Sequence, residues 1–144
     1  MEKITGIAHI AITVKDMKKS LDFYTRILGF KKAFEIPEPQ TGAPWIEYLY
    51  IGGGQFIELF YNGTKDNPWS EELRGFNHLC LQVDDIQSVV ERIKKEGAEI
   101  TDGPKQGCDN NWQAWTKDPD GIRVELMQID KKSPHYQAIQ ELSR

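Results

Sequence analysis

Histidine is scarce in this sequence, and features that mark several common protein classes are absent from it. The 144 residues include three histidines and two cysteines, Cys80 and Cys108, and neither cysteine belongs to a CxxC motif. Two cysteines are too few for a disulfide framework. No apolar run approaches the roughly 18 residues that span a bilayer, and the N-terminal residues lack the layout of a signal peptide. We therefore expect a cytoplasmic protein that does not associate with membranes.

Positive charge is also in short supply, which bears on the possible partners. The chain carries 22 acidic and 18 basic residues, for a formal net charge of −4, without a dense Lys/Arg cluster. Such a surface does not favour a phosphate backbone, so we expect no nucleic-acid partner. Hydrophobic residues make up 39% of the chain and charged residues 28%, as in a typical globular protein. The length fits one compact domain, residues 1–144, which must hold the function.

An internal repeat organises the chain. Residues 7–16 align with residues 76–85 at an offset of 69, and each segment places a histidine, His9 or His78, in a strand-like run. Each run ends in an aspartate that is a suitable N-cap, and apolar residues at helical spacing follow it. A strand followed by a helix is therefore expected in both halves of the chain.

Three short strands separated by turns are expected after each helix. The helices should end near Gly29 and Gly97, because glycine readily adopts the left-handed conformation of a helix C-terminus. The expected strands are about 30–36, 46–51, 55–61, 98–101, 111–117 and 122–129. The segment Asp102–Pro104 is expected to form a turn between two of them.

These elements predict an α+β fold made of two β-α-β-β-β modules. The first module covers about residues 4–62 and the second about 76–129, with a linker at about 63–75. The polar tail, residues 130–144, follows the second module, and a short closing helix is possible there.

Each module places one histidine on its first strand and one glutamate on its last. Because side chains alternate across a strand, His9 and His78 should face away from the large aliphatic residues beside them. Glu58 and Glu125 lie between apolar neighbours at an offset of 67. A carboxylate in the middle of such a strand costs free energy unless it is solvated, paired or bound to a metal. Solvation would explain any one of these residues, but the recurrence of both types favours a shared metal site.

The motifs resemble those of the vicinal oxygen chelate superfamily, which includes glyoxalases and bleomycin-resistance proteins. The resemblance extends from about Ile4 to Ile129, and the segments that carry it are His9–Val14, Ser20–Tyr24, Leu28–Phe30, Phe56–Leu59, His78–Asp84 and Asp118–Leu126. It implies that the two modules form an open eight-stranded cup around a divalent metal ion. The implied metal ligands are His9, Glu58, His78 and Glu125.

The order of the ligands resembles that of the bacterial glyoxalase I branch. Dioxygenase-like and fosfomycin-enzyme relatives use three ligands, and methylmalonyl-CoA epimerases are expected to carry glutamine where this chain has Glu58. Asn62 matches an asparagine that contacts the substrate in glyoxalase I. Thr13 departs from the branch, because it stands where an arginine would hold a carboxylate of glutathione. The resemblance therefore implies substrate contacts at Asn62 and Thr13 without implying glutathione as the thiol.

The implied activity is that of a metal-dependent lyase or isomerase for methylglyoxal detoxification. Its substrate would be an adduct of a 2-oxoaldehyde and a thiol, or a related 2-hydroxy carbonyl compound. One Zn, Ni, Co or Mn ion per site would stabilise an enediolate, with Glu125 as the implied base and Glu58 as its symmetric partner. Other activities stay open: an epimerase, a thiol transferase, a dioxygenase-like enzyme, or a protein that sequesters a drug or metabolite.

The expected partners are a small-molecule substrate and a second copy of the chain. Two modules leave exposed sheet edges, which pairing within one chain or across a swapped homodimer would cover. Trp45, Trp112 and Trp115 are candidates to line the mouth of the cup, although packing is the commoner role of strand aromatics. Cys80 is expected to be buried on its strand, and His135 is expected at the surface.

Overall fold

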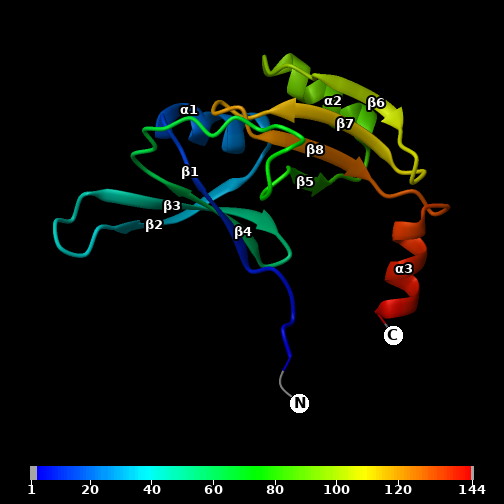
Figure 1. The fold of residues 1–144 in the computed structure, drawn as a ribbon, viewed down its shortest axis with the longest axis horizontal. Helices are drawn as coiled ribbons and strands as arrows, with labels where there is room; N and C mark the ends of the chain where they lie inside the picture. The colour runs from blue at the N-terminus through cyan, green and yellow to red at the C-terminus, as the bar shows by residue number, and fades with distance from the viewer. Residues whose placement is uncertain (1–2, 144) are drawn as a thin grey trace. The chain divides into compact units, whose positions relative to one another are not determined.

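The structure is a computed structural model that describes residues 3–143. The chain divides into two compact units, Met1–Asn67 and Pro68–Arg144, and each contains one four-stranded mixed sheet (Figure 1). We call these the first unit and the second unit. Helices accompany both sheets, so the predicted α+β class is confirmed.

The first unit has the element order that the repeat predicts. Its elements are β1 (His9–Thr13), α1 (Met17–Asp22), the π-helical turn η1 (Phe23–Ile27), β2 (Lys31–Pro37), β3 (Pro44–Gly52) and β4 (Gln55–Phe60). The strand order across the sheet is β1-β4-β3-β2, with β1 parallel to β4 and the other pairs antiparallel. The last strand of the unit therefore lies beside the first, which brings Glu58 next to the strand that carries His9.

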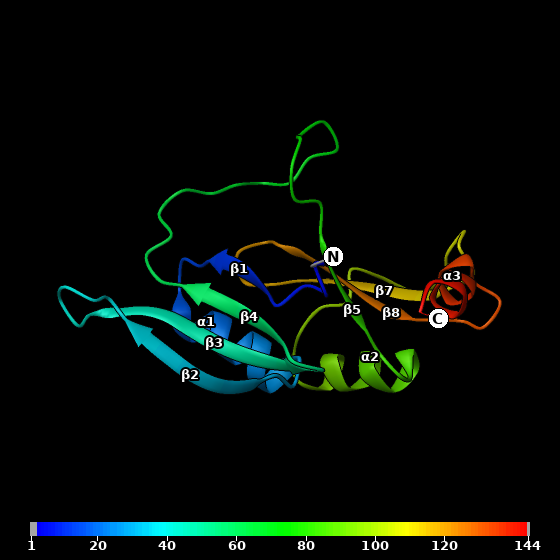
Figure 2. The same cartoon turned by 90° about the horizontal axis from the view of Figure 1, so that it is seen from below.

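The second unit repeats this arrangement. Its elements are β5 (Leu79–Gln82), α2 (Ile86–Lys95), β6 (Asp102–Gln106), β7 (Trp112–Lys117), β8 (Arg123–Gln128) and α3 (Pro134–Leu142). The strand order is β5-β8-β7-β6, again with a parallel first pair. Figure 2 shows the same elements from a second direction. The helix α3 occupies the polar tail, and none of the helices in residues 3–143 is long and apolar enough to cross a membrane.

The two helices that follow β1 and β5 begin at the predicted caps. The Asp16 carboxylate accepts a hydrogen bond from the backbone N–H of Lys19 at 3.1 Å, and the Asp85 carboxylate accepts one from Ser88 at 2.9 Å. These bonds satisfy backbone donors that a helix N-terminus leaves unpaired. Past the helices, Gly29 and Gly97 adopt φ values of 88° and 90°, as their predicted role at the C-termini requires.

Side-chain alternation gives each sheet one core face. In the first unit Ile57 and Leu59 are fully buried on either side of Glu58. In the second unit α2 buries Ile86, Val90 and Ile93 and contacts β7 and β8. Full burial of such a side chain contributes about 1.5–3 kcal/mol. The apolar positions that the repeat matched therefore form the cores that hold the strands in register.

The predicted strand at 98–101 and the turn after it are wrong. The structure has β6 at Asp102–Gln106, so the Gly-Pro pair lies inside a strand. The register with β7 is irregular between Asp102 and Lys105. A Cβ on Gly103 would lie 2.5 Å from the carbonyl oxygen of Gln113, so glycine permits a close approach to β7 there. Because β6 is an edge strand, Pro104 can be accommodated without its missing N–H.

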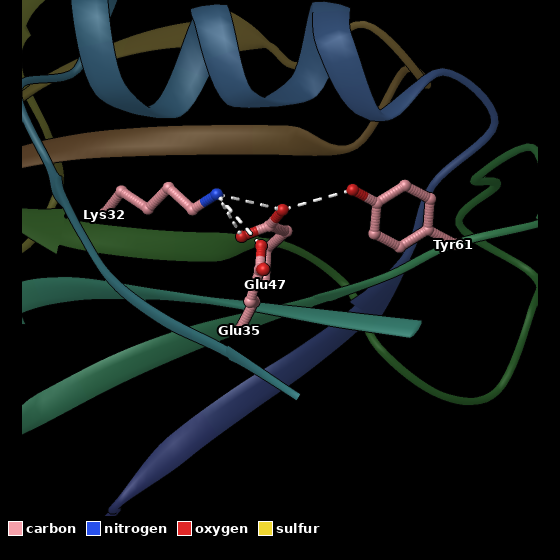
Figure 3. A network of polar contacts seen from close by, with 4 residues as sticks. All are labelled: Lys32, Glu35, Glu47 and Tyr61. Atoms are coloured by element: carbon pink, nitrogen blue, oxygen red, sulfur yellow. Dashed lines mark hydrogen bonds and ion pairs between the residues drawn. The ribbon is translucent and has the colours of Figure 1, made fainter. Parts of the chain in front are cut away.

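A buried carboxylate distinguishes the core face of the first sheet. Glu47 on β3 is 2% exposed, and its carboxylate lies 2.9 Å from the ammonium nitrogen of Lys32 (Figure 3). The Tyr61 hydroxyl donates a hydrogen bond to the same carboxylate at 3.1 Å, and Glu35 approaches Lys32 from the exposed side. The hydrogen bond with Glu47 raises the pKa of Lys32, which keeps the ammonium charged beside the buried carboxylate.

Candidate functional site

The His9 pair, formed by His9 and Glu58, lies on one face of the first sheet. Glu58 is in register with Ala11 of β1, so His9, two residues earlier, shares the face of Glu58. The imidazole Nε2 is 3.4 Å from Glu58 Oε1, and the two side chains are 46% and 7% exposed. The strand pairing therefore places a nearly buried carboxylate beside a half-exposed imidazole.

The His78 pair, formed by His78 and Glu125, has the corresponding place in the second unit. Glu125 is in register with Cys80 of β5, so His78, two residues earlier, shares its face. Here Nε2 lies 2.9 Å from Glu125 Oε2, and the side chains are 30% and 7% exposed. The structure thus brings together, within each unit, the histidine and the glutamate that the sequence singled out.

An aromatic residue that the sequence analysis passed over accompanies the His9 pair. Tyr48 of β3 is in register with Glu58, and its ring packs edge-on to His9 with centroids 6.4 Å apart. A hydrogen bond with the Glu58 carboxylate, together with burial, raises the pKa of Tyr48. Its hydroxyl therefore stays protonated and acts as a donor that holds Glu58.

Trp115 has the equivalent place beside the His78 pair. It is in register with Glu125, and its ring packs edge-on to His78 with centroids 4.8 Å apart. The indole N–H donates to the Gln113 side chain at 3.0 Å rather than to Glu125. Trp115 follows Tyr48 at the same offset, 67, that separates the two glutamates, and that spacing is the signal that could have identified Tyr48.

His78 also has a partner on its other ring nitrogen. Nδ1 lies 2.7 Å from the side-chain oxygen of Asn77, and that oxygen also accepts a hydrogen bond from Arg123 at 3.3 Å. The guanidinium of Arg123 lies over the rings of Trp69 and Trp115, 3.9 and 4.6 Å from their centroids. When Nδ1 donates to Asn77, Nε2 is the nitrogen left to bind a metal ion shared with Glu125.

The prediction that Cys80 is buried is wrong, because its side chain is exposed. Its register with Glu125 places it on the face of the His78 pair rather than on the core face with Leu79. Partial desolvation by surrounding atoms and the nearby Glu125 carboxylate raise the pKa of the Cys80 thiol to about 12. The thiol is therefore neutral near pH 7 and adds no thiolate to the donors in this unit.

The two predicted substrate contacts lie at the ends of β1 and β4 in the first unit. Thr13 is exposed at the end of β1, in register with Phe60. Asn62 is exposed just beyond β4 and has a φ of 70°, a conformation that asparagine tolerates better than most residues. The third histidine, His135, is exposed on α3, as predicted.

The donor types and spacings in both pairs fit a divalent metal ion. Zinc binds nitrogen and oxygen ligands at about 2.0–2.2 Å, so two donors on one ion stand about 3 Å apart. The nitrogen-to-oxygen distances of 3.4 and 2.9 Å agree with such a shared position. Over its described residues, neither unit gathers three or more His, Cys, Asp or Glu side chains that could hold an ion. Each unit therefore offers two donors, fewer than a protein metal centre ordinarily uses.

Known proteins are similar to this chain in sequence and in fold. The chain matches the family model of the glyoxalase/bleomycin resistance protein/dioxygenase superfamily over residues 6–126. It is 32% identical over 126 residues to the lactoylglutathione lyase of Escherichia coli O157:H7, covering 85% of this chain and 91% of that protein. It is 34% identical over 127 residues to the probable lactoylglutathione lyase of Vibrio cholerae serotype O1, covering 85% and 89%.

A solved structure of a glyoxalase family protein also has a similar fold. The crystal structure of the glyoxalase family protein from Enterococcus faecalis matches with a TM-score of 0.73 at 26% identity, covering 85% of this chain and 97% of that one. The repeated β-α-β-β-β unit, the His and Glu motifs and these matches agree with one another. The chain belongs to the glyoxalase/bleomycin resistance protein/dioxygenase superfamily.

Proposed function

We propose that this protein is a metal-dependent lyase of the glyoxalase I type, acting on the adduct of a 2-oxoaldehyde and a thiol. The observation that carries the proposal is the repeated pair, in which an imidazole Nε2 lies beside a nearly buried carboxylate. Relatives at 32% and 34% identity that are named lactoylglutathione lyase support the same branch of the superfamily.

The four ligands in this proposal are His9, Glu58, His78 and Glu125. Two neutral imidazoles and two carboxylates balance the charge of one divalent ion, and a nitrogen and oxygen set of this kind suits Zn, Ni, Co or Mn. Such an ion polarises neighbouring substrate oxygens and makes the adjacent C–H more acidic. The two units can supply their pairs within one chain or from both chains of a homodimer.

Glu125 is the better placed of the two carboxylates to move a proton. Glu58 receives a hydrogen bond from the Tyr48 hydroxyl, which holds it in position. Glu125 has Trp115 in the equivalent place, and that indole donates to Gln113. Apart from His78, the described residues offer Glu125 only the weak thiol donor of Cys80. A carboxylate held by fewer strong donors is freer to turn, so we assign Glu125 as the base that takes a proton from one carbon and returns it to the next.

Substrate contacts belong to residues at the margin of the first unit in this proposal. Asn62 and Thr13 offer an amide and a hydroxyl, both exposed. A hydroxyl does not form the bidentate, charge-assisted contact that an arginine makes with a carboxylate. The thiol half of the substrate therefore need not be glutathione.

Metal analysis tests the ligand set directly. The purified full chain should contain about one divalent ion per site, and His9→Gln, Glu58→Gln, His78→Gln and Glu125→Gln should each lose or weaken its binding. His135→Gln is the matched control, because this histidine is exposed on α3 and outside the pairs. The loaded protein should also convert methylglyoxal in the presence of a thiol, with glutathione and bacillithiol tested separately.

Two results would contradict the proposal. If the wild-type chain binds no ion near stoichiometry, or if the four variants bind it as His135→Gln does, the pairs are not a metal centre. A protein that binds small molecules without metal would then be the better description of this superfamily member.

A further inference from the structure

Two cations without acidic partners lie next to the His78 pair. Lys117 of β7 and Arg123 of β8 are in register, and the adjacent pair on the same face is Trp115 with Glu125. Over the described residues, neither cation forms an ion pair with a carboxylate. Like charges directly opposite each other on neighbouring strands destabilise a sheet. A position that keeps two of them is therefore suited to a negatively charged group that is not part of the protein.

Arg123 is held in one orientation without being neutralised. Its guanidinium contacts the faces of Trp69 and Trp115, and it donates one hydrogen bond, at 3.3 Å, to the neutral side chain of Asn77. Contacts of this kind fix the side chain and leave its net charge and its remaining N–H donors in place. An arginine already ordered in this way loses less conformational entropy when it binds an anion.

A cavity of about 270 Å³ lies at these two residues. Its lining is formed by Thr101, Asp102, Trp115, Thr116, Lys117 and Arg123. The hydroxyls of Thr101 and Thr116 already donate to backbone carbonyls, and Asp102 is paired with Lys105 at 2.5 Å. Lys117 and Arg123 are therefore the cationic donors available to an occupant. The volume suits one end of a small ligand rather than a whole cofactor.

We infer that Lys117 and Arg123 form a subsite for a carboxylate on the thiol half of the substrate. The inference rests on the proposed function, because it treats the occupant of this cavity and the group that reaches Glu125 as parts of one molecule. Lys117 and Arg123 would also supply the positive charge that is missing at Thr13 on β1. The selected substrates are adducts of thiols that carry a carboxylate.

Binding of an unreactive probe to the metal-loaded protein tests the subsite. S-methylglutathione carries carboxylates, and its dimethyl ester has the same shape without them. Calorimetry should show that Lys117→Gln and Arg123→Gln each weaken S-methylglutathione binding about tenfold, the scale of one charge-assisted hydrogen bond. Binding of the ester should change little. Lys94→Gln is the charge-matched control, because Lys94 is exposed on α2, and it should bind both probes as the wild type does.

Several outcomes would overturn the subsite. Within the described residues Lys117, unlike Arg123, stacks on neither tryptophan ring, so Lys117→Gln remains informative if Arg123→Gln fails to fold. Equal affinity of the wild type and Lys117→Gln for S-methylglutathione would refute the inference, as would an equal loss for the ester. Charge-dependent binding of inorganic phosphate, without any for S-methylglutathione, would show a site for free anions instead.

A parallel assay separates this inference from the proposed function. The adduct of methylglyoxal with 2-mercaptoethanol carries no carboxylate. If the protein converts that adduct but binds both probes equally, the lyase proposal stands and the subsite fails. If the probes differ as expected but neither this adduct nor the adducts of glutathione and bacillithiol are converted, the subsite stands and the lyase proposal fails.

Discussion

The His9 pair and the His78 pair occupy corresponding places in the repeat, yet different partners hold them. In the first unit the carboxylate is held, because the Tyr48 hydroxyl donates to Glu58. Over the described residues, the ring of His9 has no hydrogen-bonding or ionic partner other than Glu58. In the second unit the imidazole is held instead, by Asn77 on Nδ1. Both halves of the repeat therefore keep a histidine and a glutamate. A neighbouring side chain holds the glutamate in the first unit and the histidine in the second.

The largest effect on activity is expected from substitution of the two carboxylates. In the proposed function Glu58 is a ligand held by Tyr48, and Glu125 is the more mobile base. Glu125→Gln should lower kcat at saturating metal by about 10²–10⁴-fold, because it removes proton transfer. Glu58→Gln should mainly weaken metal binding and recover much of its turnover when metal is added in excess. Steady-state kinetics and the incorporation of solvent hydrogen into the product measure the difference. Full turnover by metal-bound Glu125→Gln would show that the base is another group.

A smaller effect is expected from the residue that precedes each histidine. Ala8 precedes His9, so Asn77→Ala gives His78 the same neighbour as His9 has. Losing the acceptor on Nδ1 should lower metal affinity about tenfold, at the lower end for a group that orients a ligand. Competition with a chelator measures the affinity.

The tautomer of His78 separates orientation from general damage to the fold. Nitrogen chemical shifts of the ring should show Nδ1–H in the wild type and a mixture of tautomers in Asn77→Ala. Asn77→Asp keeps the acceptor oxygen and should restore most of the affinity. Unchanged ring shifts in Asn77→Ala would mean that Asn77 does not position the imidazole.

The smallest effect is expected on the opposite face of the sheets. Glu47 in the first unit corresponds, at the offset of 67, to the fully buried Ala114 in the second. Glu47→Ala makes the two cores alike but leaves the Tyr61 hydroxyl without its acceptor and Lys32 with the exposed Glu35 in place of the buried carboxylate. The free energy of unfolding should fall by about 1–2 kcal/mol, because half-exposed Lys32 can regain water. Denaturant titration measures this, and Glu35→Gln, on the exposed side of Lys32, should cost less.

The pH dependence of the stability lost in Glu47→Ala shows whether the charge of Lys32 causes the loss. The pKa of Lys32 is raised above its ordinary value of 10.5, so the folded state binds the proton more tightly than the unfolded chain. The stabilisation is fully present below about pH 10.5 and declines as the pH rises through the raised value. If the difference in the free energy of unfolding between wild type and Glu47→Ala stays constant through this pH range, its cause is packing and not charge.

Sequence alone predicted the order of the elements and the two aspartate caps, and it singled out the histidines and glutamates that the structure brings together within each unit. These features follow from local patterns and from the repeat, which compares one half of the chain with the other. Tyr48 was missed because its role depends on cross-strand register, although its offset from Trp115 carried the information. Asn77 and Arg123 were missed because their contact joins residues 46 positions apart.

The two errors have local causes. Glycine and proline commonly mark turns, so the Gly103-Pro104 pair favoured a turn where the structure has an irregular edge strand. Cys80 was placed in the core by its residue type, yet it stands two residues after His78 and must share that histidine's face. In both cases the prediction followed the usual preference of a residue type, whereas the position of the residue in its strand determines the structure.

The close approach at Gly103 also determines how much room a ligand has. Thr101 and Asp102, which line the cavity at Lys117 and Arg123, directly precede this glycine on the chain. Any side chain at position 103 would meet the backbone of β7 at 2.5–2.9 Å and force the edge strand outward. The wall of the cavity would move with it. The absence of a side chain at Gly103 therefore helps to set the size of the space that is open to a ligand.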